Sequence, residues 1–362
     1  MSKTIRDGLA GAVLICGLSA MPFGCGVIAQ TTSEQTTSEQ TTRPFSEWCE
    51  EKESLPAPTR QTIEAAMAAV EATSCTAAQT QLTILSELNL DQSQLSDLRP
   101  LTALPQLTTL KLSGNNISNI TPLAQLNNLT HLNLSHNRLT DLSPLAELNQ
   151  LIYLDLAGNQ ISNLSPLSSL TGLNDLNLLS NRVSDLSPLS PLQDLVWLEL
   201  SANRITDINT VAGFSYLKHL GLANNQVQDL SALTNLDWLQ GLNLSNNQIE
   251  DISPLSNMIY LDALVLANNN ISETSALGSM SSLTSLNLEN NEISSVTSLS
   301  TLNELRQLNL AENQLSEVDA IASLSQLTWL NLSSNQITDA TRLNQLEQLR
   351  FADLSNNPIN EP

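Results

Sequence analysis

Seven residues in the middle of the chain carry side chains suited to acid–base chemistry or to the binding of a ligand. Two imidazoles, three carboxylates and two aromatic rings recur there at related spacings: His131, Tyr153, Asp155, Asp175, Trp197, Glu199 and His219. A carboxylate beside an imidazole could act as a general acid or base, and a pair of carboxylates can hydrolyse a glycoside. Exposed aromatic rings among acids are equally the composition of a contact site for a protein or a carbohydrate.

The spacing of these residues favours binding over catalysis. Five of the seven follow one another in steps of 22 residues, which places them on neighbouring copies of one repeated unit. A repeated surface of this kind is shallow and open to water, so it neither raises the pKa of a carboxylate nor stabilises developing charge easily. The sequence also lacks a nucleophile motif, a phosphate-binding loop and a zinc motif. It therefore predicts a non-enzymatic protein without a catalytic residue, a cofactor or a metal site.

Two further groups of side chains are candidates for binding. The first lies near the C-terminus and combines basic, amide and aromatic side chains: Arg306, Gln307, Trp329, Arg350 and Phe351. Its aromatic rings could instead shield the open end of the repeat array. The second group fills the last position of three successive repeats: Tyr216, Trp238 and Tyr260. Aromatic rings in such a row usually stack on one another as local structure, and binding is the alternative.

A strict 22-residue period positions all of these residues. Twelve of thirteen consecutive units carry Asn at the ninth position: Asn115, Asn137, Asn159, Asn181, Asn203, Asn225, Asn247, Asn269, Asn291, Asn313, Asn335 and Asn357. Ser93 replaces it in the first unit, and Leu fills the first and sixth positions of all thirteen. Leu also fills the fourth position except in the last unit, which has Ala352. A single unit cannot bury these leucines, so neighbouring units must stack into a common core.

Each unit predicts a short strand, a turn and a compact return segment. The alternating Leu-x-Leu at positions four to six is typical of a strand with one buried face. The Asn that follows can both donate to and accept from backbone groups that leave the sheet, so the asparagines should form a structural ladder. Six units have Pro in the return segment, which favours short 3₁₀ or extended turns over a long helix: Pro100, Pro122, Pro144, Pro166, Pro188 and Pro254.

The pattern LxxLxLxxNxIxxIxPLxxLxx resembles the leucine-rich repeat family, and within it the short repeats of the bacterial internalins. The resemblance covers residues 85–362. It implies an α/β fold, a right-handed solenoid with a concave parallel β-sheet that binds other macromolecules, and short turns on the convex side. The sequence has neither an immunoglobulin-like domain after the repeats nor an LPxTG sorting signal. Host-cell adhesion, the best-known internalin role, is therefore not expected.

Positions two, three, five, seven and eight of each unit are expected to point outward. Because neighbouring strands lie ~4.8 Å apart, thirteen units would build a face on the order of 60 Å long. The first group of seven residues occupies positions three and five of units three to seven. We therefore expect it to form one continuous patch on this face.

The first part of the chain reads as an export signal and a linker. Residues 1–29 combine a basic start with a small, apolar stretch and are predicted to be a signal peptide cleaved after Ala29. An uncleaved membrane anchor and lipidation of Cys25 are alternatives. Residues 30–44 contain the polar repeat TTSEQTTSEQTT and are predicted to be a disordered tether. The mature chain should have no membrane span, and the protein should be periplasmic, at the cell surface or extracellular.

Residues 45–84 should form a helical cap over the first repeat. The stretch Gln61 to Ser74 is rich in Ala, Glu and Met, and Pro56 and Pro58 mark the start of a helix there. Cys49 and Cys75 flank this stretch. They are the only cysteines left if cleavage follows Ala29. Two cysteines in an exported chain predict one disulfide, with free buried thiols as the alternative.

The chain is strongly acidic, with a net charge of −22 from 36 acidic and 14 basic residues. Such a surface argues against binding to nucleic acid or anionic lipid. Part of the acidity belongs to the repeat, because position thirteen often carries a carboxylate: Asp97, Asp141, Asp185, Asp207, Asp229, Asp251, Glu273, Glu317 and Asp339. Asp suits the local backbone bonding of a turn, and calcium binding by this row is the alternative.

The sequence thus predicts an exported binding protein that recognises a protein partner through the concave face of a repeat solenoid. Binding of a surface glycan or a structural role in the cell envelope is the alternative. A third reading is an intracellular scaffold, such as a phosphatase-binding leucine-rich repeat protein. The export signal, the linker and the cysteine pair argue against this third reading.

Overall fold

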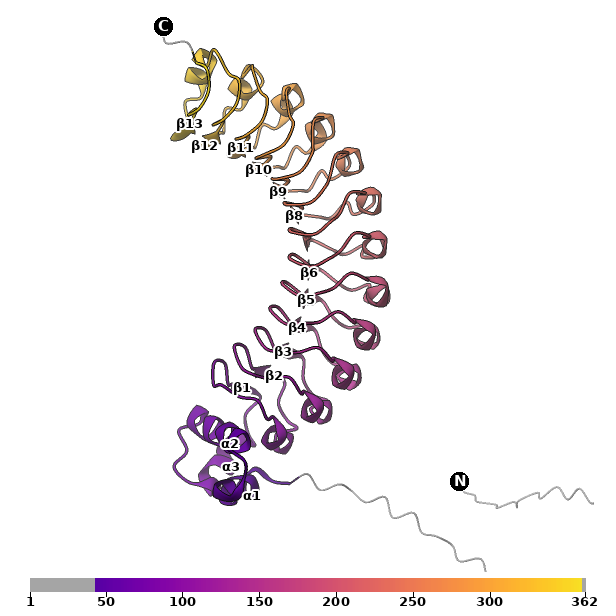
Figure 1. Ribbon diagram of the computed structural model, residues 1–362, viewed down its shortest axis with the longest axis vertical. Helices are drawn as coiled ribbons and strands as arrows, with labels where there is room; N and C mark the ends of the chain where they lie inside the picture. Colours follow the sequence, from indigo (N-terminus) through magenta and orange to yellow (C-terminus); the bar gives the residue numbers. More distant parts are fainter. Residues whose placement is uncertain (1–42, 360–362) are drawn as a thin grey trace, which may run out of the picture. The chain divides into compact units, whose positions relative to one another are not determined.

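The computed structural model describes residues 43–359, which form one unit of thirteen stacked repeats preceded by three helices (Figure 1). The helices are α1 (Phe45–Glu50), α2 (Ala57–Ala69) and α3 (Cys75–Leu82). The predicted signal peptide and nearly all of the predicted tether lie outside the described residues, as do residues 360–362 of the last repeat.

Each repeat contributes one three-residue strand to a single parallel sheet. The strands are β1 (Glu87–Asn89), β2 (Thr109–Lys111), β3 (His131–Asn133), β4 (Tyr153–Asp155), β5 (Asp175–Asn177), β6 (Trp197–Glu199), β7 (His219–Gly221), β8 (Gly241–Asn243), β9 (Ala263–Val265), β10 (Ser285–Asn287), β11 (Gln307–Asn309), β12 (Trp329–Asn331) and β13 (Phe351–Asp353). They follow one another in sequence order, and each residue pairs with the residue 22 positions later. The predicted 22-residue period therefore sets the register of the sheet.

The return segments form short 3₁₀ helices on the side of the repeats opposite the strands (Figure 1). They are Arg99–Ala103, Thr121–Gln125, Ser143–Glu147, Ser165–Ser169, Ser187–Leu189, Asn209–Gly213, Ser231–Leu233, Ser253–Leu255, Ser275–Ser279, Thr297–Thr301, Ile321–Ser323 and Thr341–Gln345. Where Pro is present it stands in the first turn of the 3₁₀ helix. An N–H group there would have no partner within the helix, so the missing N–H of Pro costs no hydrogen bond. This agrees with the prediction from the prolines.

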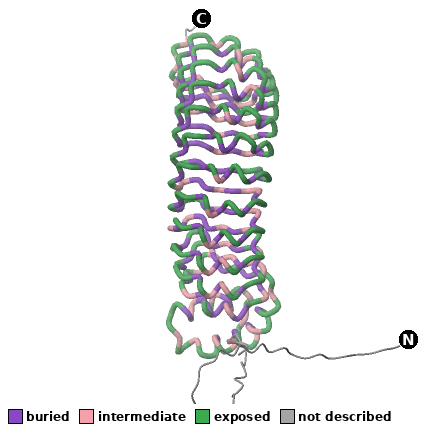
Figure 2. Tube along the Cα trace, turned by 90° about the vertical axis from the view of Figure 1, so that its right-hand side faces the viewer, coloured by how far each residue is buried: buried purple, intermediate pink, exposed green. Residues whose placement is uncertain are grey.

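The leucines of successive repeats merge into one continuous core. In the third repeat, Leu129, Leu132, Leu134 and Leu139 are all fully buried. Figure 2 shows buried and exposed segments alternating along every rung of the stack. Ala352 replaces the fourth-position Leu in the last repeat and is exposed, because no further repeat covers it among the described residues.

The asparagine ladder connects each repeat to the one before it. The Asn137 Nδ2 donates to the carbonyl oxygen of Leu134 in its own repeat (3.0 Å) and to that of Leu112 in the preceding repeat (2.9 Å). Its Oδ1 accepts from the N–H of Ile117, also in the preceding repeat (3.0 Å). Each carboxamide thus satisfies buried backbone groups of two repeats, as its donor and acceptor atoms predict.

The three N-terminal helices cap the first repeat. Phe45, Ile63 and Leu82, one from each helix, are fully buried in the core that the repeats continue. A disulfide joins Cys49 in α1 to Cys75 in α3, as predicted from the cysteine count, with their Cα atoms 5.5 Å apart.

The cap helix differs from its predicted extent. α2 begins at Ala57, where Pro56 and Pro58 predict its start, but it ends at Ala69 and does not continue to Ser74. The chain turns at Glu71, whose φ of 51° is left-handed and cannot continue a right-handed helix. This turn leads into α3, which begins after Ser74, whose side chain accepts from the N–H of Ala77.

Candidate functional site

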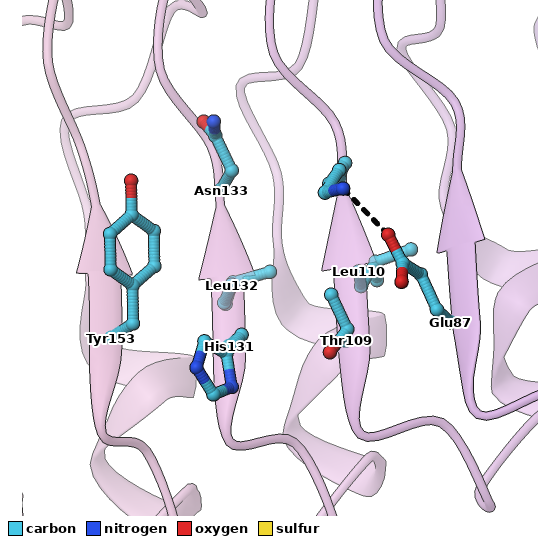
Figure 3. Close-up of a pocket in the computed structure, with 8 residues that line it drawn as sticks. Glu87, Thr109, Leu110, His131, Leu132, Asn133 and Tyr153 are labelled. Atoms are coloured by element: carbon cyan, nitrogen blue, oxygen red, sulfur yellow. Dashed lines mark hydrogen bonds and ion pairs between the residues drawn. The ribbon is translucent and has the colours of Figure 1, made fainter.

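A shallow depression of about 390 Å³ lies on the strand side of the first four repeats (Figure 3). Strands β1 to β4 line it with Glu87, Thr109, Leu110, Lys111, His131, Leu132, Asn133 and Tyr153. The leucines turn into the core, while the side chains at positions three and five stand on the face of the sheet. The alternation of the strands therefore decides which residues form the wall of this depression.

An ion pair forms one side of the depression. The Lys111 Nζ lies 2.6 Å from the Glu87 Oε1 on the neighbouring strand, and both side chains are exposed to solvent. The hydrogen bond and the charge of Glu87 raise the pKa of Lys111. Lys111 is therefore protonated throughout the physiological range and offers a positive charge next to a carboxylate.

Stacked rings form the other side. The imidazole of His131 and the phenol of Tyr153 are 6.0 Å apart between centroids and 18° from coplanar. Burial raises the pKa of Tyr153, and the charges of Asp155 and Asp175 add to this effect. The hydroxyl group thus stays neutral and can donate a hydrogen bond to a ligand.

Asp155 is half-buried beside Tyr153, and burial raises its pKa while the hydrogen bond from the backbone of Ala157 opposes that rise. Its Oδ1 accepts from the N–H of Ala157 at 3.0 Å. Asn133, at the same position of the preceding repeat, accepts from the N–H of Ser135 at 2.9 Å. A neutral Asn therefore performs the same structural task, and the fold does not require the negative charge of Asp155.

The other residues of the first predicted group continue along the face on β5, β6 and β7. Asp175 and Trp197 are half-exposed, and His219 is exposed. The Glu199 carboxylate accepts from the N–H of Ser201 (2.7 Å) and lies where a side chain at Gly221 would stand. A larger residue at position 221 would therefore require the Glu199 carboxylate to move aside.

The register brings the seven predicted residues onto five adjacent strands, but the depression holds only two of them, His131 and Tyr153. The prediction did not include Glu87, Thr109 and Lys111, which complete it. Opposite charges at positions three and five of adjacent repeats were the signal that could have identified the Glu87–Lys111 pair. The outward direction expected for position seven is wrong in most repeats. Small residues there are buried against the turn: Ser135, Ala157, Ser201, Ala223, Ser245, Ala267 and Ala311.

The C-terminal group is only partly brought together. Trp329 and Phe351 stack with centroids 5.7 Å apart and planes 10° apart. Gln307 and Trp329 help to line a second depression of about 390 Å³, together with residues of β9 to β11. Arg306 and Arg350 are exposed at position two, beside the strands.

The acidic residues at position thirteen serve the turns. The carboxylate of Asp141 accepts from the backbone N–H and from the hydroxyl of Ser143, and these bonds lower its pKa. Asp185, Asp251 and Asp339 show the same lowering from the same cause. Among residues 43–359, no three His, Cys, Asp or Glu side chains are grouped closely enough to hold a metal ion. In the same range, no helix has the length and apolar character needed to cross a membrane.

Comparison with sequence families identifies the repeats. The family model described as "Leucine Rich repeats (2 copies)" matches residues 105–147, 127–168, 149–191 and 217–257. A second model, "Leucine Rich repeat", matches residues 279–296 and 325–340. No curated protein sequence matches this chain.

Solved structures show the same architecture over most of the chain. The internalin InlF from Listeria monocytogenes is 33% identical, with a TM-score of 0.75, and the alignment covers 84% of this chain and 99% of that one. A leucine-rich repeat protein from Leptospira interrogans is 27% identical with a TM-score of 0.71, and the alignment covers 76% and 74% of the two chains. A plant peptide hormone receptor, solved in complex with RGF2, is 24% identical with a TM-score of 0.59 over 71% of this chain and 49% of that one. This last similarity shows the fold alone.

Proposed function

Because this chain belongs to the leucine-rich repeat family, we propose that it is an exported, non-enzymatic protein that binds a protein partner through the concave face of its sheet. The observation that carries this proposal is the run of exposed and half-exposed, chemically varied side chains on β1 to β7 above an unvarying layer of leucines. A scaffold that stays constant while its outward residues vary is suited to recognition of a large partner.

The depression on β1 to β4 supplies the chemistry of an interface anchor. It combines an aromatic pair, His131 and Tyr153, with an exposed ion pair between Glu87 and Lys111. Aromatic residues dominate the binding free energy of many interfaces, and charged neighbours set the orientation of the partner. A protein side chain could displace water from the rings and replace one partner of the ion pair.

Asp155 provides a second argument that this face binds a partner. Its raised pKa shows that its charge is held at a cost, although Asn performs the same backbone contact in the preceding repeat. A residue that costs stability where a neutral one would suffice is expected where function demands it. Charge at this position suits a partner that presents a basic group.

Export is supported by the disulfide between Cys49 and Cys75, because disulfides persist mainly in oxidising compartments. Secretion of the full-length chain can be measured by fractionation of the producing cell. Recovery of the protein only from the cytosol, with both thiols free, would contradict this part of the proposal.

The binding proposal is tested with the double variant Tyr153→Ala/Trp197→Ala as bait in pull-downs from envelope and culture-medium extracts. Both side chains are only half-exposed, but they stand on the sheet face rather than in the core, so the thermal unfolding temperature should stay close to that of the parent. A protein retained by the parent and lost by the variant is the expected result. The matched control is Trp329→Ala/Phe351→Ala, which removes two aromatic rings from the other end of the same face and should retain the partner.

Two outcomes would contradict the assignment of this face. Equal retention by both double variants would place the partner elsewhere on the molecule. Retention of a glycan, and of no protein, would favour the alternative of a carbohydrate-binding surface.

A further inference from the structure

A row of exposed aromatic residues lies outside the concave face and is not used by the proposed function. Tyr216, Trp238 and Tyr260 each precede a strand by three residues, at β7, β8 and β9. Because these strands pair in register, the three residues occupy equivalent places on neighbouring repeats. We call these three residues the aromatic edge.

The aromatic edge is exposed to an unusual degree. Tyr216, Trp238 and Tyr260 are 62%, 58% and 47% exposed, and Ile259 beside them is 46% exposed. Two of the three tyrosines of the whole chain are placed here. A row of large apolar side chains that the core leaves uncovered marks a surface of interaction more often than single exposed residues do.

The rings are arranged as a stacked pair and one separate ring. Trp238 and Tyr260 are parallel within 2°, with their centroids 5.2 Å apart. Trp238 remains 58% exposed although Tyr260 covers one of its faces, so its other face, toward the repeat of Tyr216, is open to solvent. The predicted stacking of all three rings therefore holds for one pair, and the exposure of all three rules out a core role.

Three aspartates occupy positions next to this row in the repeats. Asp194 occupies the same repeat position as the aromatic edge in the preceding unit, Asp237 adjoins Trp238, and Asp262 follows Tyr260 by two residues. Among residues 43–359, none of these three carboxylates takes part in an ion pair. Lys218 is the one cation at the neighbouring positions, and no aromatic ring is stacked with it in the described residues.

We infer that the aromatic edge is a second docking surface and that it takes an extended, arginine-containing segment of a partner protein. A guanidinium group is planar, stacks on the open face of an indole or phenol ring, and donates hydrogen bonds to a carboxylate at the same time. An extended segment that runs across the repeats would meet one position of the row about every 4.8 Å, which is the separation of neighbouring strands. The net charge of −22 also attracts a basic segment over long range.

The test measures binding of two synthetic peptides of about ten residues, one of alternating Arg and Gly and one of alternating Lys and Gly, by fluorescence anisotropy on the full chain. Since Arg stacks on aromatic rings better than Lys does, the Arg peptide should bind more tightly at equal charge. Trp238→Ala/Tyr260→Ala should weaken its binding by about tenfold and bring the two peptides close to equal affinity.

Two matched variants separate this surface from the general acidity of the protein. Trp329→Ala/Phe351→Ala removes the other stacked Trp-aromatic pair and should change the affinity for the Arg peptide by less than about twofold. Asp237→Asn should weaken binding more than Asp175→Asn, although both remove one negative charge. Thermal unfolding of each variant checks that the repeats remain folded.

Three results would overturn the inference. Equal affinity of the parent for the two peptides would show that net charge alone drives the interaction. An equal loss of affinity for the Arg peptide in the two aromatic double variants would show that the peptide does not bind specifically at the aromatic edge. Binding of the neutral sugar oligomer cellohexaose, lost in Trp238→Ala/Tyr260→Ala while the Arg peptide is unaffected, would identify a carbohydrate surface in place of a peptide surface.

Discussion

At the residue scale, the ninth-position asparagine is the side chain on which the stack depends. Asn137 donates to three backbone carbonyl groups, each of which also accepts from a second donor. It also accepts from the N–H of Ile117, which has no other partner among residues 43–359. Its own side chain is buried, so water cannot replace these partners. The cost of losing one such carboxamide therefore includes the desolvation of every backbone group that it leaves unpaired.

Asn137→Ala should lower the free energy of unfolding by about 3 kcal/mol, since four buried hydrogen bonds are lost together and the N–H of Ile117 loses its partner. Chemical denaturation measures this change. Asn149→Ala is the control, because Asn149 is exposed and its change should stay within about 0.5 kcal/mol. Equal losses from both substitutions would show that the ladder does not carry the expected stability.

Asp155→Asn should make the protein more stable at neutral pH. The raised pKa means that the folded chain binds this proton more tightly than the unfolded chain, so stability falls as pH rises from the ordinary carboxyl value to the pKa of the folded state. The advantage of the variant should vanish below about pH 3, where the parent side chain is also neutral. Unfolding temperatures of both proteins across pH decide this, and a variant that is less stable at pH 7 would contradict it.

At the element scale, a small polar cluster joins the cap to the first repeat. Thr59 in α2 donates to the Asp97 Oδ2 (2.6 Å), and Arg99 donates to the same oxygen (2.7 Å). Thr62 donates to the Asp97 backbone carbonyl, and Gln61 to that of Ser93. Asp97 occupies the turn position that is exposed in most other repeats, so the cap uses a repeat residue for its own attachment.

Asp97→Ala should loosen the cap by about 2 kcal/mol, because a charged acceptor of several hydrogen bonds is lost. Burial alone would raise the pKa of Asp97, but its bonds with Arg99 and Thr59 outweigh burial and lower it. The contribution of Asp97 is therefore complete above the ordinary carboxyl pKa and is lost as pH falls through its lowered value.

Amide hydrogen exchange in α2 measures this attachment. Exchange should be faster in Asp97→Ala than in Asp141→Ala, which removes the same kind of turn residue from a repeat without a cap contact. The parent should approach the exchange rate of Asp97→Ala in acid. If Asp141→Ala increased exchange in α2 equally, the cluster would have no special role.

At the scale of the whole molecule, the negative charge of the protein is spread along the stack of repeats. The net charge is −22, while the ion pairs of residues 43–359 are few and mostly exposed, so they contribute little attraction. An acidic residue stands at position thirteen of most repeats, which places like charges on neighbouring repeats in much of the stack. Self-repulsion is therefore distributed over the length of the sheet.

Adding sodium chloride should raise the thermal unfolding temperature by a few degrees. Between about 0.01 M and about 0.15 M salt, the Debye length falls from about 30 Å to about 8 Å, and repulsion between repeats is screened. Chloride is preferred because sulfate also strengthens apolar burial. A lower unfolding temperature in salt would mean that attractive ion pairs outweigh the repulsion.

The sequence by itself determined the features that every repeat shares. The 22-residue period predicts the parallel register, alternating leucines predict the buried face of each strand, and Asn and Pro predict the ladder and the short return segments. These features follow from local chemistry that is repeated thirteen times, so only one stacking arrangement accommodates all of them in every repeat. The Cys49–Cys75 disulfide belongs here too, since these are the only two cysteines outside the predicted signal peptide.

Only the tertiary structure decided how the varied residues meet. Glu87 and Lys111 join His131 and Tyr153 around one depression, whereas Asp175, Trp197 and His219 lie on the same face outside it. Tyr216 stays apart while Trp238 and Tyr260 stack, and α2 ends where the chain must turn to bring α3 onto the first repeat. These outcomes depend on side-chain directions and on contacts across neighbouring repeats. A repeat pattern specifies which residues are neighbours, but rotamers and packing determine which of them touch.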